Sequence, residues 1–238
     1  MPAATMMSDH CLLVVSFRLD VEQEPAFSAF LHHAHLPAVM AAVPAIRTAW
    51  RYQEHHVTGS LKYYRKHFLT LLDLASPADA AAAEAAIAAD PAWRRWCSSG
   101  AIHDLDPPCL YRQRWAHPRR PPDGPFGSRP FFMVGVELDP ARADAFHDWY
   151  EQDYLTKNVA DVPSWTACRR YASEGRSPQR HLAIYEAADL AALDASLDMM
   201  RAPFRLDENM AWKRWDSGAA PAITWEDAAT YRPIYRRP

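Results

Sequence analysis

The chain of 238 residues repeats itself at a nearly constant offset, and this feature constrains its fold most strongly. Two tryptophans stand in register in one of the matches. The matches at an offset of 119 residues are 15–20 with 134–139, Val43-Pro44 with Val162-Pro163, Arg51-Tyr52 with Arg170-Tyr171, and 92–96 with 211–215. After one gap, His67 pairs with His181 at an offset of 114 residues. Such an ordered series is typical of a tandem duplication.

The segment that separates the two copies is rich in proline, glycine and arginine. Residues 116–130 read AHPRRPPDGPFGSRP. Proline fixes φ and lacks a backbone N–H, so this stretch neither continues a strand nor holds a helix. The sequence therefore predicts a first repeat at 1–115, a linker at 116–130 and a second repeat at 131–238.

One repeat shows alternating strand and helix patterns. Apolar β-branched runs predict strands, the spacing of Phe27, Phe30 and Leu31 predicts a helix, and Ser76 before a proline is a typical N-cap. The predicted elements are strand 11–20, helix 25–42, strands 45–54 and 66–75, helix 78–89, a helical piece after Asp90, and strand 104–115. This order is β-α-β-β-α-β, the split βαβ of the ferredoxin-like fold.

Both helices of such a unit cover one face of the sheet, so its other face must be buried by another partner. Two copies in one chain supply that partner. We therefore expect an α+β protein, in which tandem ferredoxin-like units form a dimeric α+β barrel within one chain.

Charge and composition exclude several classes of protein. The formal net charge is −3 and the isoelectric point about 6.4, which argues against nucleic-acid binding. No apolar stretch reaches the roughly 18 residues of a membrane span. The four cysteines form no CxxC motif, so we expect reduced thiols in a cytoplasmic protein.

The helix-to-strand segment resembles that of EthD-like dimeric α+β barrel proteins. The residues that carry this resemblance are His35-Leu36-Pro37 followed by Val43-Pro44 and Tyr52, and in the second copy 148–155 followed by Val162-Pro163 and Tyr171. The chain departs from the family pattern at Ala45 and Ser164, which replace glycine. Tyr154 stands where the first copy has His35, so the two copies cannot be chemically equivalent.

The resemblance implies an acid–base role for His35, because a histidine can take a proton next to a carbonyl at physiological pH. In the second copy, Tyr154 could donate a hydrogen bond to an oxyanion and Asp153 could act as a base. We expect His35, Tyr154 and Asp153 to be catalytic. A structural role for each is the alternative. His32, His33 and His35 do not form a complete metal motif, so we predict no metal site.

A second set of residues is predicted to bind substrate. Histidines near the start of the third strands could line a pocket, and arginines on the second strands could orient a substrate carboxylate. This set is His67, His181, Trp50, Arg51, Trp149 and Arg170. The tryptophan pairs at 93–96 and 212–215 are instead expected to pin the second helix of each copy to the sheet.

The sequence favours a cofactor-independent enzyme of small-molecule metabolism that acts on an aromatic, lactone or polyketide-like compound. The expected chemistry is general acid–base catalysis of isomerisation, cyclisation or degradation, without a cofactor. The alternatives are a non-catalytic ligand-binding or accessory protein, and a haem-binding barrel protein with His67 or His181 as ligand. The expected partner is a small molecule, and a homodimer of fused chains stays open.

Overall fold

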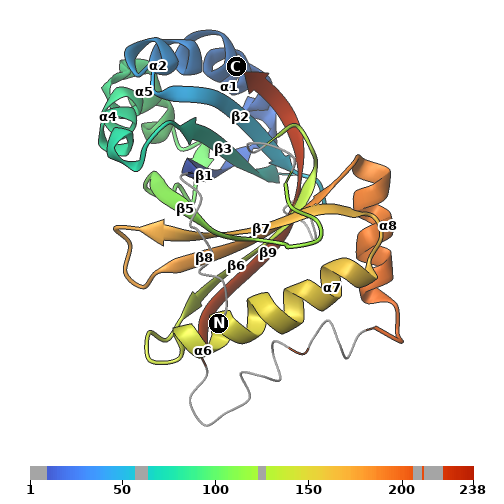
Figure 1. Cartoon of the computed structure of the whole chain (residues 1–238). Coiled ribbons are helices and arrows are strands. Elements are labelled where there is room, and N and C mark those ends of the chain that lie inside the picture. The colour runs from blue at the N-terminus through green and yellow to red at the C-terminus, as the bar shows by residue number, and fades with distance from the viewer. Residues whose placement is uncertain (1–9, 57–63, 123–126, 206–210, 212–221) are drawn as a thin grey trace. The chain divides into compact units, whose positions relative to one another are not determined.

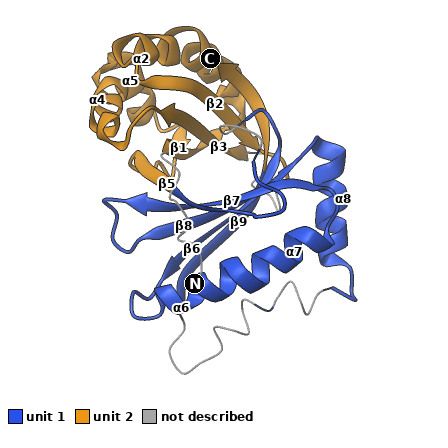
Figure 2. Ribbon diagram, viewed as in Figure 1, with its two compact units in different colours: residues 1–8, 113–230 blue, residues 9–112, 231–238 orange. Residues whose placement is uncertain are grey.

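The computed structural model describes residues 10–56, 64–122, 127–205, 211 and 222–238. The chain divides into two compact units (Figure 2). Unit 1 comprises residues 1–8 and 113–230, and unit 2 comprises residues 9–112 and 231–238. Both units are mixed α+β, as the sequence predicts. The sequence-based boundaries at 115 and 131 stay a prediction, since two strands run from one unit into the other.

Unit 2 contains a sheet with helices on one of its faces (Figure 1). Its elements are β1 (Cys11–Asp20), α1 (Glu24–Phe30), α2 (Leu36–Ala42), β2 (Ile46–Glu54), β3 (Arg65–Leu74), α4 (Ala80–Ala89), α5 (Pro91–Ser98), β4 (Ile102–His103) and the first half of β5 (Cys109–Ala116). Strand β1 lies between β3 and β5, and β2 lies beyond β3. The order β5-β1-β3-β2 has the first and third strands at its centre. The far edge of β2 pairs with residues 231–237.

Unit 1 has the same strand order. Its elements are β6 (Phe131–Leu138), α6 (Ala143–Trp149), α7 (Leu155–Asp161), β7 (Trp165–Glu174), β8 (Arg180–Ala187), α8 (Leu190–Arg201) and the first half of β9 (Ile223–Arg237). The order is β9-β6-β8-β7, and β5 adds at the edge of β7. In chain order, the long strands of each unit therefore follow the sequence fourth, first, third and second across the sheet.

Two side chains cap helical segments in unit 2: Ser76, which the sequence predicts as an N-cap, and Asp90. Ser76 Oγ accepts the backbone N–H of Ala78, and Asp90 Oδ1 accepts that of Ala92. The predicted strand at 104–115 is different: it is interrupted, and β5 begins only at Cys109. Asp104 has a φ of 49°, and Pro107 and Pro108 cannot donate to a ladder, so the chain turns before it pairs again.

The start of the predicted linker packs on unit 1. His117 is fully buried, and Arg120 donates from Nη1 to the carbonyls of Val162 (2.8 Å) and Trp165 (2.6 Å). These carbonyls follow the end of α7, where orphan acceptors favour a cation. Residues 117–120 thus form part of the unit rather than a free spacer.

Both long helices contain a π-helical turn in their middle. The turns are η2 (Leu31–His35) and η4 (Tyr150–Tyr154). They lie 119 residues apart, the offset of the sequence repeat. π-turns within α-helices are rare and frequently mark functional sites. The sequence analysis predicts one continuous helix here, because hydrophobic spacing does not distinguish a single π-turn.

A cluster of aromatic side chains lies within the largely aliphatic core of unit 2. Trp93 is buried and Trp96 is half-buried, and both pack near Phe27, at centroid distances of 6.2 Å and 5.1 Å. Trp93 also lies 6.3 Å from Phe17 of β1, so Trp93 packs α5 against the sheet, whereas Trp96 packs against α1. The second pair, Trp212 and Trp215, lies outside the described residues.

In the described part of the chain, no helix is long and apolar enough to cross a membrane.

Candidate functional site

His35 is the last residue of the π-turn η2 and points into unit 2. It is 2% exposed. Its ring stacks on Trp93 at a centroid distance of 5.1 Å and an interplanar angle of 15°. Its Nδ1 lies 2.8 Å from Asp90 Oδ2. A carboxylate can only accept, so Nδ1 carries the proton and Nε2 is left as an acceptor.

Asp90 holds this histidine while it caps a helix. Its Oδ1 accepts the Ala92 N–H at 2.8 Å, and its Oδ2 accepts His35 Nδ1–H. Burial opposes ionisation of Asp90, but the hydrogen bonds from His35 and Ala92 outweigh it and place its pKa below the usual range. Burial lowers the pKa of His35, and the contact with Asp90 opposes this only in part. His35 is therefore a neutral, oriented base at neutral pH.

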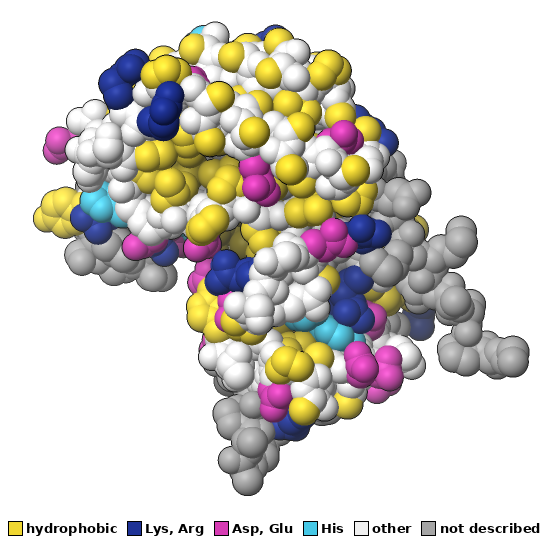
Figure 3. Space-filling view, turned by 90° about the vertical axis from the view of Figure 1, so that its left-hand side faces the viewer, with side chains coloured by type: hydrophobic (Ala, Val, Ile, Leu, Met, Phe, Trp, Pro, Cys, Tyr) yellow, Lys and Arg dark blue, Asp and Glu magenta, His cyan; other side chains and the backbone are white. Residues whose placement is uncertain are grey.

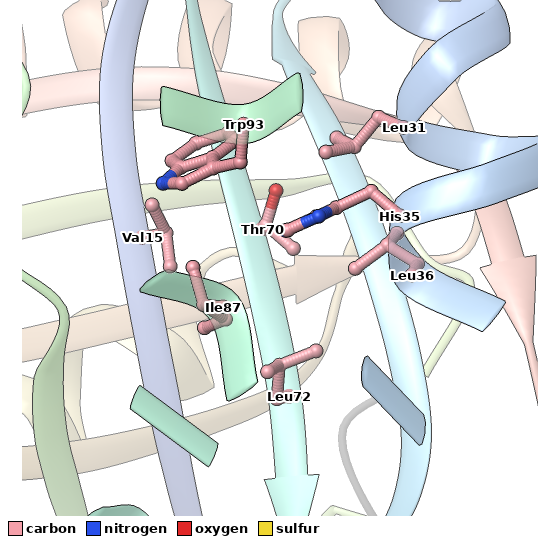
Figure 4. A pocket seen from close by; sticks show the side chains of 8 residues that line it. All are labelled: Val15, Leu31, His35, Leu36, Thr70, Leu72, Ile87 and Trp93. Carbon is pink, nitrogen blue, oxygen red and sulfur yellow. The ribbon is translucent and has the colours of Figure 1, made fainter. Parts of the chain in front are cut away.

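A small pocket adjoins the His35 ring. It is lined by Val15, Leu31, His35, Leu36, Thr70, Leu72, Ile87 and Trp93 (Figure 4). Figure 4 shows the His35 ring directed toward Thr70, the other polar side chain of this lining. The cavity volume is about 10 Å³, which is room for one water molecule. A larger substrate therefore has to displace part of the apolar wall.

Arg51 lies on the same face of the sheet, next to this pocket. Arg51 and Thr70 stand opposite each other in the antiparallel pair of β2 and β3, so both side chains face the helices. Arg51 is fully buried, and its Nη1 donates to Ser28 Oγ (2.7 Å) and His32 Nε2 (3.2 Å). Burial lowers the pKa of His32 to about 4 and that of Arg51 to about 10.

The two strand histidines of the predicted substrate-binding set do not occupy matching positions. In the pairing of β1 with β3, His67 stands opposite Arg18. In the pairing of β6 with β8, His181 stands opposite Val136. At the offset of 119 residues, Val136 matches Phe17 and not Arg18. The residue opposite Phe17 is Phe68. The pairing of His67 with His181 at offset 114 is therefore wrong by one residue. Because side chains alternate along a strand, this slip places the two rings on opposite faces of their sheets.

His67 contributes to a hydrogen-bond chain on the other face of unit 2. Its Nε2 lies 2.8 Å from Ser16 Oγ, and its Nδ1 lies 2.9 Å from Tyr231 Oη. Both ring nitrogens are occupied, so His67 does not fit the role of a haem ligand. His181 keeps a buried Nδ1 without a partner among the described residues, but the His147 ring lies 4.3 Å from its own.

Unit 1 contains a buried polar cluster around Arg170, the residue that matches Arg51 at the offset of 119 residues. Arg170 Nη1 donates to Glu151 Oε1 (2.7 Å) and His147 Nδ1 (3.1 Å), and Arg114 Nε donates to the same Glu151 oxygen (2.7 Å). Burial, together with the nearby cations Arg170 and Arg114, lowers the pKa of His181 to about 3. Burial also lowers the pKa of His147 strongly. Both imidazoles are neutral beside two cations.

The predicted catalytic pair of the second copy is not brought together. Tyr154 is buried and stacks on Tyr150 at 5.0 Å, and burial raises its pKa far above that of a free tyrosine. Trp149 packs against Tyr154 at 5.4 Å. The neighbouring Asp153 is exposed. An acid–base partnership of Asp153 with Tyr154 therefore has no support in this geometry.

Trp50 points away from the helices of unit 2, on the face opposite Arg51. It is 3% exposed, and the Arg236 guanidinium lies 5.0 Å from its ring centroid. It thus takes no part in the pocket at His35.

Sequence reasoning missed Asp90, Thr70, His147, Glu151 and Arg114. Asp90 stands directly before Pro91, which starts a helix, and this pattern is typical of an N-cap. The pattern does not predict that Asp90 also binds a histidine.

On the face shown in Figure 3, hydrophobic side chains gather over unit 2 and line a hollow, whereas charged side chains and histidine stand close together on unit 1. On this face, the two units thus differ in the kinds of side chain that they present.

Comparison with known proteins identifies the fold. No protein-family model matches the chain, and no curated protein is significantly similar to it in sequence. An anthrone oxidase-like protein of known structure has a TM-score of 0.64 at 13% identity, with 97% of this chain and 93% of the other covered. A candidate monooxygenase from Fusobacterium nucleatum has a TM-score of 0.56 at 10% identity, with 97% and 95% covered.

A variant chlorite dismutase from Candidatus Nitrospira defluvii has a TM-score of 0.54 at 11% identity, with 95% of this chain and 92% of the other covered. Together these matches place the chain among proteins of the dimeric α+β barrel fold. At such identities they show the fold and no particular reaction. The EthD-like resemblance and the tandem duplication stay predictions.

Proposed function

We propose that this protein is a cofactor-independent enzyme of small-molecule metabolism, and that His35 is its general base. The observation that carries the proposal is the geometry of His35: a buried, neutral imidazole, fixed at Nδ1 by Asp90, whose ring borders a pocket. A base held in one tautomer by a carboxylate is a recurrent arrangement in acid–base catalysis.

The proposed reaction begins with proton abstraction from carbon next to a carbonyl. His35 Nε2 takes the proton, and the electron pair of the C–H bond moves onto the carbonyl oxygen to form an enolate. A substrate that fills the largely apolar pocket displaces water from it, which strengthens this proton transfer. Return of the proton to another carbon gives isomerisation. Attack of the enolate carbon on a second carbonyl forms a C–C bond and an alkoxide, which takes the proton back from His35 and completes cyclisation. The substrate class is an aromatic, lactone or polyketide-like carbonyl compound.

Several further points belong to this proposal. The two units derive from a tandem duplication, which is supported by their shared strand order and by π-turns that lie 119 residues apart. The EthD-like segment around His35 is the copy that kept the acid–base group. The protein binds a small molecule, and a homodimer of fused chains is its proposed assembly.

The experiment that tests the proposal is hydrogen–deuterium exchange into a panel of carbon acids. Anthrone, an unsaturated five-membered lactone and a 1,3-diketone are incubated with the protein in D₂O and followed by NMR. The wild-type protein should accelerate exchange of at least one compound, and His35→Ala should reduce that rate by about 100-fold or more. The matched control is His33→Ala, an exposed residue of the same π-turn, which should keep the wild-type rate.

Two results would contradict the proposal. One is an exchange rate with His35→Ala equal to that of the wild type. The other is a panel in which no compound exchanges faster than in buffer, which favours a non-catalytic ligand-binding protein.

A further inference from the structure

Arg51 carries two donors that the described residues leave unused. Its Nε and Nη2 are buried and have no hydrogen-bond partner in the described part of the chain. The side chain is 0% exposed, and its guanidinium carbon lies 4.6 Å from the Phe68 centroid and 5.2 Å from the Phe27 centroid. Buried donors without acceptors cost folding free energy, so each such group calls for an explanation.

The two unused nitrogens form one edge of the guanidinium. Nε–H and one Nη2–H point in parallel, and this edge matches the two oxygens of a carboxylate. Nη1, on the other edge, already donates to Ser28 and His32. The Nε–Nη2 edge therefore has the donor geometry that binds a planar monoanion through two hydrogen bonds.

Other arginines of this chain show what the same edge does when it is filled. Arg169 donates from Nε and Nη2 to Glu186, and Arg180 does so to Glu137. Arg232 uses the same two nitrogens on the amide oxygen of Gln53. Arg51, which is as deeply buried as Arg169, has no such oxygen among the described residues. The charged neighbour that acts on its pKa is Glu24, which is bound by Gln53 and Lys66.

The location of this edge connects it to the candidate active site. Arg51 stands opposite Thr70 across the β2–β3 pair, and Thr70 lines the pocket that His35 borders. Opposite residues of an antiparallel pair have Cβ atoms about 5 Å apart. An anion held by Arg51 therefore lies beside Thr70, on the side of the sheet that His35 faces.

We propose that Arg51 binds the carboxylate of the substrate through its Nε–Nη2 edge, so that the substrate of this enzyme is a small carboxylic acid. This inference rests on the proposed function of the His35 site and names its substrate class. A carboxylate fits better than a phosphate, because one cation with a planar pair of donors matches a planar monoanion and not a tetrahedral dianion.

The test uses benzoate and acetate as probes, with benzamide, acetamide and phosphate for comparison, all at constant ionic strength. Benzoate or acetate should raise the melting temperature of the wild-type protein saturably, since a ligand that binds only the folded state stabilises it. The amides and phosphate should not. Arg51→Lys keeps the charge but loses the parallel donors, and should bind the carboxylate at least tenfold more weakly. The control Arg47→Gln, an exposed position on the same strand, should bind like the wild type.

A second measurement uses the wild-type chain and needs no variant to fold. In protein labelled with ¹⁵N-arginine, the Nε–H resonance of Arg51 should shift as benzoate is added. That of Arg169, already bonded to Glu186, should stay in place. Stabilisation by benzoate without a shift at Arg51 overturns the inference, as does the absence of any carboxylate-specific effect.

These readouts involve no turnover, so they separate this inference from the proposed function. Binding at Arg51 without proton exchange in the carbon-acid panel refutes the His35 reaction and leaves a carboxylate-binding site. His35-dependent exchange in that panel, together with benzoate binding that Arg51→Lys leaves unchanged, refutes the carboxylate site alone.

Discussion

His35 and Asp90 act together because one carboxylate serves two neighbours. Asp90 caps α5 through one oxygen and orients His35 through the other. Asn is nearly as good an N-cap as Asp, but its amide does not stabilise an imidazolium as a carboxylate does. The two roles of Asp90 can therefore be separated by substitution.

The substitution Asp90→Asn should lower the rate of His35-dependent exchange by about 10- to 100-fold, because the histidine loses its anionic partner. The free energy of unfolding should stay within about 0.5 kcal/mol, since the cap is kept. Asp90→Ala should also lose about 1 kcal/mol of stability through the missing cap. Exchange kinetics and urea denaturation measure the two effects. Equal rates for wild type and Asp90→Asn would contradict the orienting role.

His181 makes the stability of the protein depend on pH. Burial, together with Arg170 and Arg114, lowers its folded-state pKa to about 3, whereas the unfolded chain has a value near 6.5. Between these values the unfolded state binds the extra proton, so the free energy of unfolding falls as pH falls below about 6.5.

Replacement of His181 by Phe should therefore reduce the fall in the free energy of unfolding at low pH. Phe is the residue that the first repeat has at the equivalent register position, Phe68. Between pH 7.5 and pH 5, the variant should lose about 2 kcal/mol less stability than the wild type. Urea unfolding at the two pH values measures the difference. An unchanged pH dependence would show that His181 titrates alike in both states.

At the scale of elements, the strands are predictable and the π-turns are not. Strand β1 has the predicted bounds 11–20, because its apolar run and the acidic residue that follows are local signals. A π-turn adds one residue to a helix without changing the hydrophobic spacing much, so η2 is invisible in the sequence. The register of β3 is hidden for a similar reason. His67 and Phe68 are adjacent, and only strand pairing shows which one faces the helices.

Deletion of His33 should convert η2 into regular α-helix. This residue is exposed, so its removal costs little packing, but the part of the helix that precedes it turns by about 100° relative to His35. We expect helix content by circular dichroism to be kept and exchange activity to fall by about 100-fold. Activity at the wild-type level after the deletion would show that the π-turn does not position His35.

At the scale of the whole molecule, distant segments complete each unit. Residues 231–238 belong to unit 2 although the rest of that unit ends at residue 112. Tyr231 is fully buried and bonds to His67, and Arg232 bonds to Gln53. The repeat in the sequence does not reveal this, because it shows which segments are alike and not which segments pair.

Truncation after Thr230 should consequently destabilise unit 2. The loss of a buried tyrosine, its hydrogen bond and the pairing with β2 should cost about 3 kcal/mol or more. Native-state hydrogen exchange of the β2 amides measures it, because those amides lose the partner strand. Unchanged protection of β2 would show that residues 231–238 add nothing to the unit.

The central claim is that His35 is a neutral base with its proton on Nδ1 and a free Nε2. The most direct measurement is ¹⁵N NMR of the His35 ring as a function of pH, assigned by comparison with His35→Gln. The account predicts a protonated Nδ1 and an unprotonated Nε2 at pH 7, with a pKa below 6.5. An imidazolium at pH 7, or a proton on Nε2, would contradict it.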